Sequence, residues 1–303
     1  MSDIALATRS PVAAIMQAVL DSVGSEHTRR AYERALSEFF VWHEKQGRPK
    51  LERPVVQRYV SFLRGEGVPP SSINQRLSAI RRMVREAVEN GALSNEIASG
   101  IISIQGAQRR GKRAGNWLTK DEAQELLRKP NVNRRKGLRD RAILAVLIGC
   151  GLRREEAAGL TLAHIQQRDG RWVIVDLLGK RNKVRSVPMP NWTKSALDAW
   201  TRTAGIIDGA IFRAMDKGGK VAGETLTAQA IRNVVVFYSS MISKDVAPHD
   251  LRRTYAKLAH KGGSALDQIQ LSLGHDSIKT TETYLGVDQD LTDAPCDHIG
   301  LQL

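Results

Sequence analysis

Apolar residues recur every three or four positions over most of this chain, which is the spacing of helices that bury one face. In the first hundred residues this spacing predicts four helices, which begin at Pro11, near Ser25, at Arg53 and at Ser71. Proline at a first helical position and serine just before a helix are typical of helix starts. Glycines near the expected ends fit helix stops. The first part of the chain is therefore predicted to be a bundle of four or five helices.

The pattern is lost over residues 105–116, QGAQRRGKRAGN, which are polar, basic and without an apolar period. Such a segment is typical of a linker. We therefore expect three parts: a helical domain over 1–104, a basic linker over 105–116, and a second domain over 117–303.

The second domain combines helices with a short β-rich stretch. Thr119 followed by Glu122 fits a capping box at a helix start, and residues 138–150 form a helix that becomes fully apolar. The runs 171–177 and 184–188 flank GKRNK and predict a hairpin. Helical spacing returns from Asn191 onward. The predicted fold class is mainly α, with a small antiparallel β-sheet or hairpin in the C-terminal domain.

The net charge of the chain indicates what kind of partner it binds. The formal net charge is +14, and residues 1–116 carry half of it, since they hold 18 Lys and Arg against 11 Asp and Glu. A strongly basic, foldable protein points first to a polyanion, above all nucleic acid. A basic protein without such a partner is the alternative. Because the excess is shared by both parts of the chain, both are expected to face the polyanion.

Clusters of arginine mark the candidate DNA-binding positions. Those on predicted helices are Arg29, Arg30, Arg34, Arg76, Arg81 and Arg82, and those in the linker are Arg109, Arg110, Lys112 and Arg113. The alternative for each is an ordinary solvated surface.

The two cysteines, Cys150 and Cys296, are too few and too far apart for a disulfide framework. Cys150 lies in an apolar run and is expected in the core, whereas Cys296 and His298 are too few ligands for a metal site. The N-terminus lacks the pattern of a signal peptide, and no apolar run approaches the roughly 20 residues that span a bilayer. A cytoplasmic location without membrane contact is expected.

The most informative stretch runs from Pro248 to Leu285. His249 and Arg252 are three residues apart and share one face if the chain is helical there. His275 follows a glycine at a helix boundary, and Tyr284 comes nine residues later, near the end of a short helix. An arginine fork matches phosphate oxygens, and a tyrosine hydroxyl can act as a covalent nucleophile. These four residues suit a site that holds and attacks a phosphodiester.

This stretch resembles the C-terminal signature of the tyrosine recombinases, the phage-integrase family that includes the Xer and Cre recombinases. H-D-L-R at His249 matches the family's H-x-x-R, and L-G-H-D-S-I-K-T-T-E-T-Y matches its box ending in the tyrosine. The N-terminal arrangement S-E-H-T-R-R-A-Y and the later S-I-N-Q-R-L-S-A-I are similar to the family's core-binding domain, whose helices lie against the DNA.

The resemblance implies further site residues. In G-L-R-R-E-E it places the first catalytic arginine at Arg153, and it places a supporting acidic residue at Glu156. The family also carries a lysine on the hairpin; Lys180 is the preferred candidate and Lys183 the competing one.

With these residues, the resemblance implies a site-specific DNA recombinase. Arg153 and Arg252 would clamp the phosphate, His249 and His275 would donate hydrogen bonds or move protons, and Tyr284 would attack to give a 3′-phosphotyrosyl intermediate. Lys180 would protonate the leaving 5′-oxygen. No metal, ATP or other cofactor is expected. The alternatives are a type IB topoisomerase with the same chemistry and a DNA-binding regulator without strand transfer.

The resemblance also implies the assembly. Double-stranded DNA sites would be paired by a homotetramer whose C-terminal segments pass between protomers. The alternation of Ile299, Leu301 and Leu303 favours docking as an added strand. A frayed terminus is the alternative.

Overall fold

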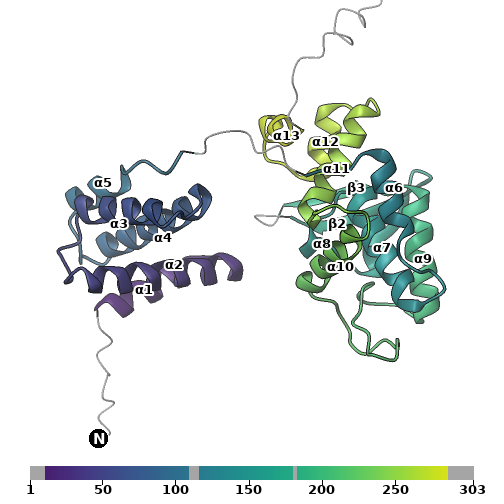
Figure 1. Ribbon diagram of the computed structural model, residues 1–303, viewed down its shortest axis with the longest axis horizontal. Helices are drawn as coiled ribbons and strands as arrows, with labels where there is room; N and C mark the ends of the chain where they lie inside the picture. The colour runs from purple at the N-terminus through teal and green to yellow at the C-terminus, as the bar shows by residue number, and fades with distance from the viewer. Residues whose placement is uncertain (1–10, 109–115, 180–182, 286–303) are drawn as a thin grey trace, which may run out of the picture. The chain divides into compact units, whose positions relative to one another are not determined.

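The computed structural model describes residues 11–108, 116–179 and 183–285, and it divides into two compact units, Met1–Arg113 and Ala114–Leu303 (Figure 1). Each unit has its own hydrophobic core. The linker predicted over 105–116 stays a prediction, because most of it lies outside the described residues.

The described part of the first unit is all helical. Its five helices are α1 (Pro11–Asp21), α2 (Glu26–Lys45), α3 (Arg53–Gly65), α4 (Pro70–Glu89) and α5 (Asn95–Ile102). The predicted bundle is confirmed, with α4 starting at Pro70, one residue before the expected serine. Ser94 caps α5 by accepting a hydrogen bond from the backbone N–H of Ile97.

The core of the first unit is built on aromatic side chains from α2 and α3. The ring of Tyr59 lies 5.1 Å from that of Phe39 and 5.0 Å from that of Trp42, measured between centroids. All three side chains are buried, and so is the apolar stripe of α4 that includes Leu77 and Ile80. Burial of this apolar area is the main force that holds the helices together.

One polar side chain fastens the end of the unit. Asn74 on α4 donates to the carbonyl of Ala107 at 3.0 Å and accepts from its backbone N–H at 2.7 Å. The neighbouring Gly106 leaves room for this contact, because a Cβ there would lie 2.6 Å from the amide oxygen of Asn74. Asn74 belongs to the S-I-N-Q-R-L-S-A-I motif, and these two hydrogen bonds explain why an asparagine stands at this position.

The second unit is built around α7 (Arg135–Gly149), whose residues from Ala142 to Leu147 are almost fully buried. Against it pack helices from before and after it in the chain. Its neighbours are α6 (Lys120–Arg128), α8 (Arg154–Ala158), α9 (Asn191–Ala204), α10 (Ala228–Ser240) and α11 (Pro248–Lys261). The short helices η1 (Leu162–His164), α12 (Leu266–Leu273) and α13 (Ile278–Leu285) are the remaining helices in the described part of the unit.

The predicted capping box at the start of α6 is confirmed. The hydroxyl of Thr119 accepts from the backbone N–H of Glu122 at 3.3 Å, and the carboxylate of Glu122 accepts from the N–H of Thr119 at 2.8 Å. Thr227 sets the start of α10 at Ala228, because its hydroxyl accepts from the backbone N–H of Ala230 at 3.1 Å.

The small sheet has three antiparallel strands in the order β1 (Ile165–Arg168), β2 (Arg171–Leu178) and β3 (Val184–Pro188). The sequence pattern predicted β2 and β3 but missed β1, which is short and mostly polar. The register of β2 with β3 shifts by one residue between Ile174 and Leu177. Asp176 lies within this shift at φ 55°, as in a β-bulge. The shift pairs Leu177 with Arg185.

Cys150 is fully buried, as predicted, and burial raises the pKa of its thiol. Over the described ranges, the helices are all too short or too polar to cross a membrane.

Candidate active site

The start of α11 sets the first pair of site residues. Pro248 occupies the first turn, and the carboxylate of Asp250 accepts from the backbone N–H of Ala247 at 2.9 Å. Both features favour a helix start at this point. His249 and Arg252 therefore lie one turn apart, as the sequence spacing predicted.

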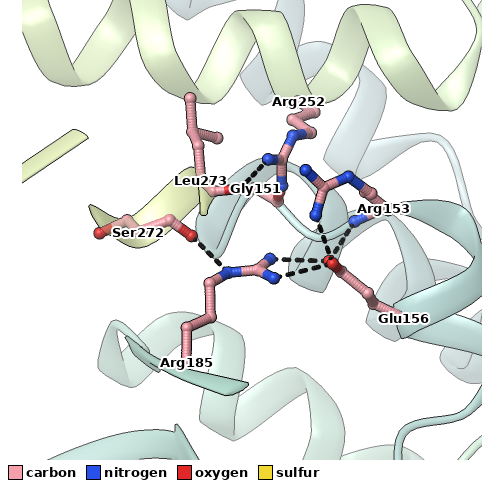
Figure 2. A network of polar contacts seen from close by, with 7 residues as sticks. All are labelled: Gly151, Arg153, Glu156, Arg185, Arg252, Ser272 and Leu273. Carbon is pink, nitrogen blue, oxygen red and sulfur yellow. Dashed lines mark hydrogen bonds and ion pairs between the residues drawn. The ribbon is translucent and has the colours of Figure 1, made fainter. Parts of the chain in front are cut away.

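Arg252 is held by two carbonyl groups from distant parts of the chain. Its side chain is 1% exposed, and it donates to the carbonyl of Gly151 at 2.6 Å and to that of Leu273 (Figure 2). Gly151 adopts φ 61°, and a Cβ there would lie 2.5 Å from the ring of Tyr255. Glycine is thus required in the G-L-R segment on both counts.

Arg153 and Glu156 form the second pair. Arg153 occupies the position before α8, and the Glu156 carboxylate accepts from both its backbone N–H at 2.8 Å and its Nη1 at 2.7 Å. The Glu156 side chain is 4% exposed and that of Arg153 is 29% exposed. The acidic residue predicted to support the site therefore touches the arginine that it was expected to orient.

A third arginine, Arg185, was missed by the sequence analysis. Figure 2 shows it reaching from β3 to Glu156, where Nη1 and Nη2 donate to the two carboxylate oxygens at 2.8 Å each. Its Nε donates to the carbonyl of Ser272 at 2.9 Å. Alternation along β3 was the available signal: Arg185 shares a face with buried Val187, and an arginine at an inward position requires a partner.

His275 follows the end of α12 as predicted. Gly274 terminates that helix at φ 60°, a left-handed C-cap. The Nδ1 of His275 lies 3.0 Å from the hydroxyl of Thr281, which is fully buried on α13. Thr281 thus fixes the plane of the imidazole, a role that the sequence analysis did not assign.

Burial and surrounding positive charge favour the neutral form of both histidines. Burial, then the charges of Arg252, Arg153, His249 and Arg185, lower the pKa of His275 to about 4. Burial and neighbouring arginines likewise lower the pKa of His249. Such mutual influence requires these groups to lie close together.

The Glu156 carboxyl is charged despite its burial. Burial raises its pKa, but the hydrogen bonds and charge of Arg185 and the hydrogen bonds from Arg153 outweigh this and lower the pKa to about 2. Glu156, Arg153, Arg185 and Arg252 together carry a net charge of +2. A partly buried excess of arginine charge is suited to an anion such as a phosphodiester.

Two predicted site residues cannot be placed. Lys180 lies outside the described residues, and so does the phenol of Tyr284, although its backbone belongs to α13. The hairpin base is near the arginines, since a Cβ at Gly179 would lie 3.8 Å from Nη1 of Arg153. The competing Lys183 forms an ion pair with Asp276, and both side chains are largely exposed.

The arginines predicted to bind DNA differ in their surroundings. Arg34 is exposed, whereas Arg76 pairs with Glu38 at 2.6 Å and Arg81 donates to the carbonyl of Ile104. Arg29, Arg30 and Arg82 pair with Asp21, Glu26 and Glu86. Arg109, Arg110, Lys112 and Arg113 lie outside the described residues. The DNA contacts of the whole set stay a prediction.

Comparison with known proteins finds two family models. The model described as "Phage integrase family" matches residues 116–290, and the "Phage integrase, N-terminal SAM-like domain" matches residues 19–91. Tyrosine recombinase XerC of Pelobacter propionicus is 31% identical over 275 residues, which cover 88% of this chain and 86% of that protein. Tyrosine recombinase XerD of Pseudomonas aeruginosa is 28% identical over 273 residues and 86% of each chain.

Solved structures share the fold. The XerH site-specific recombinase bound to palindromic difH substrate, in a post-cleavage complex, has a TM-score of 0.67 at 18% identity. That match covers 86% of this chain and 76% of the other. The Tn1549 transposon integrase in complex with a circular intermediate DNA also has a TM-score of 0.67, at 16% identity, over 96% of this chain and 99% of the other.

Proposed function

Since this chain belongs to the phage integrase family and is a site-specific recombinase of the tyrosine type, we propose that it cleaves and rejoins double-stranded DNA with the residues gathered around Arg153 and Arg252. The single observation that carries the proposal is the convergence of the two arginines with His249 and His275. The relatives favour neither of the two alternatives, a type IB topoisomerase and a DNA-binding regulator without strand transfer.

In the proposed reaction, the phenol oxygen of Tyr284 attacks the phosphorus while the bond to the 5′-oxygen breaks. The product is a 3′-phosphotyrosyl link and a free 5′-hydroxyl. Arg153 and Arg252 stabilise the charge that develops on the non-bridging oxygens. Lys180, with Lys183 as the competing candidate, gives the leaving oxygen its proton.

The histidines are proposed to manage the other proton. Burial and neighbouring positive charge lower the pKa of His275, so its imidazole is neutral near pH 7. A bound phosphodiester offsets the charge of the arginines and makes the imidazole more basic, so that it can accept the proton that Tyr284 loses. The same proton can return when a second 5′-hydroxyl attacks the covalent link. Since the bond energy is conserved in that link, rejoining requires no nucleotide cofactor.

Covalent capture tests this function. The protein and its Tyr284→Phe variant are incubated with sheared DNA from the source genome in the presence of EDTA, then denatured in SDS, and the attached DNA is sequenced. We expect a Tyr284-dependent adduct at one recurring sequence. Adducts scattered over all sequences would indicate the topoisomerase reading, and tight binding to a defined site without any adduct would indicate the regulator.

The assembly is proposed to be a homotetramer that pairs two DNA sites and exchanges C-terminal segments between protomers. The relatives whose structures contain DNA support DNA as a partner. The tail residues Ile299, Leu301 and Leu303 lie outside the described residues. Removing residues 297–303 should weaken pairing of two duplexes in a gel assay while sparing binding to one. Unchanged recombination by the truncated protein would exclude the tail's role.

A further inference from the structure

Arg185 joins three parts of the second unit that each carry a site residue. It lies on β3, two residues after Lys183, the competing lysine candidate. Its guanidinium binds the carboxylate of Glu156 beside Arg153, and its Nε binds the carbonyl of Ser272 shortly before His275 (Figure 2). None of the sequence motifs includes this residue.

Arg185 and Arg153 share the carboxylate of Glu156. One carboxylate oxygen accepts from Nη1 of Arg153 at 2.7 Å and from Nη1 of Arg185 at 2.8 Å. The other accepts from the backbone N–H of Arg153 and from Nη2 of Arg185, both at 2.8 Å. A carboxylate has about four lone-pair directions, so these bonds saturate Glu156. Arg185 thus determines how Glu156 can present itself to Arg153.

The contact with the turn before His275 is close-packed as well as polar. A Cβ at Gly274 would lie 2.9 Å from Cδ of Arg185, and Gly274 has a positive φ. The aliphatic stem of Arg185 therefore fills the space beside this glycine, while its Nε holds the carbonyl two residues earlier. The direction in which the chain leaves α12, and with it the place of His275, depends on this arginine.

From these contacts we propose that Arg185 is a positioning residue for DNA strand cleavage, which sets the Glu156–Arg153 pair and the Gly274–His275 turn in one arrangement. The proposal rests on the proposed function, since it concerns the cleavage step. Only arginine offers a planar fork for Glu156 and a third donor for Ser272. A lysine at this position would supply the charge without the geometry.

Loss of Arg185 has a signature beyond loss of stability. Burial acts to raise the pKa of Glu156, and Arg185 opposes it most strongly, so the pKa rises when Arg185 is replaced. Below the raised pKa, Glu156 is neutral and no longer pairs with Arg153 as an ion. Cleavage by an Arg185 variant should therefore fall steeply as the pH falls toward that pKa. His275 titrates in the same region, and the charge of Arg185 is one of the causes that lower its pKa. The pKa of His275 should therefore rise in each variant that lacks Arg185, the double variant included, so a loss at low pH that only the single variant shows is due to Glu156.

The experiment compares Arg185→Met, Arg185→Lys and the double variant Arg185→Met/Glu156→Gln with the parent. Single-turnover formation of the SDS-stable adduct is measured with excess protein on sheared genomic DNA, across a range of pH, alongside DNA binding and urea unfolding. Removing one partner of a buried pair leaves the other as an unpaired buried charge, which the double variant avoids. Arg171→Met, on an exposed position of β2, is the matched control.

We expect Arg185→Met to slow adduct formation roughly ten- to hundredfold near neutral pH, the scale of a misplaced catalytic group, with DNA binding retained. Arg185→Lys should be intermediate. The double variant should be slow too, but without the added loss at low pH. Arg171→Met should match the parent.

Two results would overturn the proposal: parent rates for the Arg185 variants, or a loss that is equal at every pH and follows the unfolded fraction. If Arg185→Met does not fold, the double variant decides, and a parent rate in it overturns the proposal. Absence of a Tyr284-dependent adduct from the parent itself would instead contradict the proposed function, and the role of Arg185 in cleavage would fall with it.

Discussion

The hydroxyl of Thr281 orients a site residue without being titratable itself. It lies 3.0 Å from Nδ1 of His275 and is fully buried on α13. A hydroxyl can donate or accept, so it can serve either tautomer of the imidazole. Because the hydroxyl comes from a fully buried side chain, its loss removes a partner that fixes the plane of the ring.

Replacing Thr281 by valine keeps the volume and removes the hydroxyl. We expect cleavage to slow about five- to tenfold, the value of roughly one hydrogen bond, with DNA affinity unchanged. Thr281→Ser keeps the hydroxyl and is the control, expected to stay near the parent rate. Rates of adduct formation measure both, and equal rates for the valine and serine variants would contradict this role.

The lowered pKa of His275 is the second prediction at this scale. Removing a positive neighbour favours the protonated imidazole, so Arg153→Met should raise the His275 pKa from about 4. Arg154→Met removes a guanidinium that is paired with Glu155, and it should shift the pKa less. NMR titration of the imidazole measures both variants. A shift of equal size in the two would contradict the arrangement.

The lowered pKa of His275 also makes the free energy of unfolding depend on pH. An unfolded histidine has a pKa near 6.5, so between about 6.5 and about 4 the unfolded chain binds more protons than the folded one. The free energy of unfolding should therefore decrease as the pH falls through this window. His275→Gln should flatten that decrease in urea titrations at several pH values.

Among the helices and strands, the regular ones could be predicted from sequence and the irregular ones could not. The apolar stripes of α3 and α4 are strongly periodic, and their positions followed from that period alone. Strand β1 has no such pattern, since Ile165–Arg168 is held by pairing with β2 rather than by its own residues. Pairing partners are a tertiary feature, which local spacing does not contain.

The site divides in the same way. Arg153, Glu156, Arg252 and His275 lie in segments whose motifs are local, and the structure brings them together. Arg185 and Thr281 act through contacts with residues far away in the chain or across a turn. A motif search assigns residues with recognised spacing, whereas a supporting contact is visible only once the elements are packed.

Asn74 provides a prediction about the first unit. Its side chain makes two hydrogen bonds to Ala107 and so fastens the segment after α5 onto α4. Asn74→Ala should destabilise the unit by about 1–3 kcal/mol and speed proteolytic cleavage after Ile104, because the backbone of Ala107 loses its partner. Gln75→Ala, on the exposed side of α4, is the control. Limited proteolysis followed by mass spectrometry locates the cuts, and equal cleavage of both variants would refute the role of Asn74.

At the scale of the whole molecule, the cationic side chains that contact phosphate groups determine how DNA binding responds to salt. Each phosphate contact releases counterions, so the logarithm of affinity falls with the logarithm of salt concentration. Arg34→Gln, at an exposed position of α2, should reduce the magnitude of that slope by about one. Arg202→Gln, exposed at the end of α9, should leave it unchanged. Fluorescence anisotropy over a salt series measures both, and identical slopes would remove Arg34 from the predicted DNA-binding surface.

The hydrogen bonds that saturate the Glu156 carboxylate also limit which substitutions this chain can accept during evolution. A neutral residue at 185 would strand a buried anion, and a neutral residue at 156 would strand the Arg185 guanidinium, whose side chain is 9% exposed. Selection should therefore remove single substitutions at either position, whereas simultaneous substitutions at both positions can persist. Gly274 stands apart from this pair, because its positive φ favours glycine whatever side chain occupies position 185. Positions 156 and 185 should accordingly vary together among descendants of this chain.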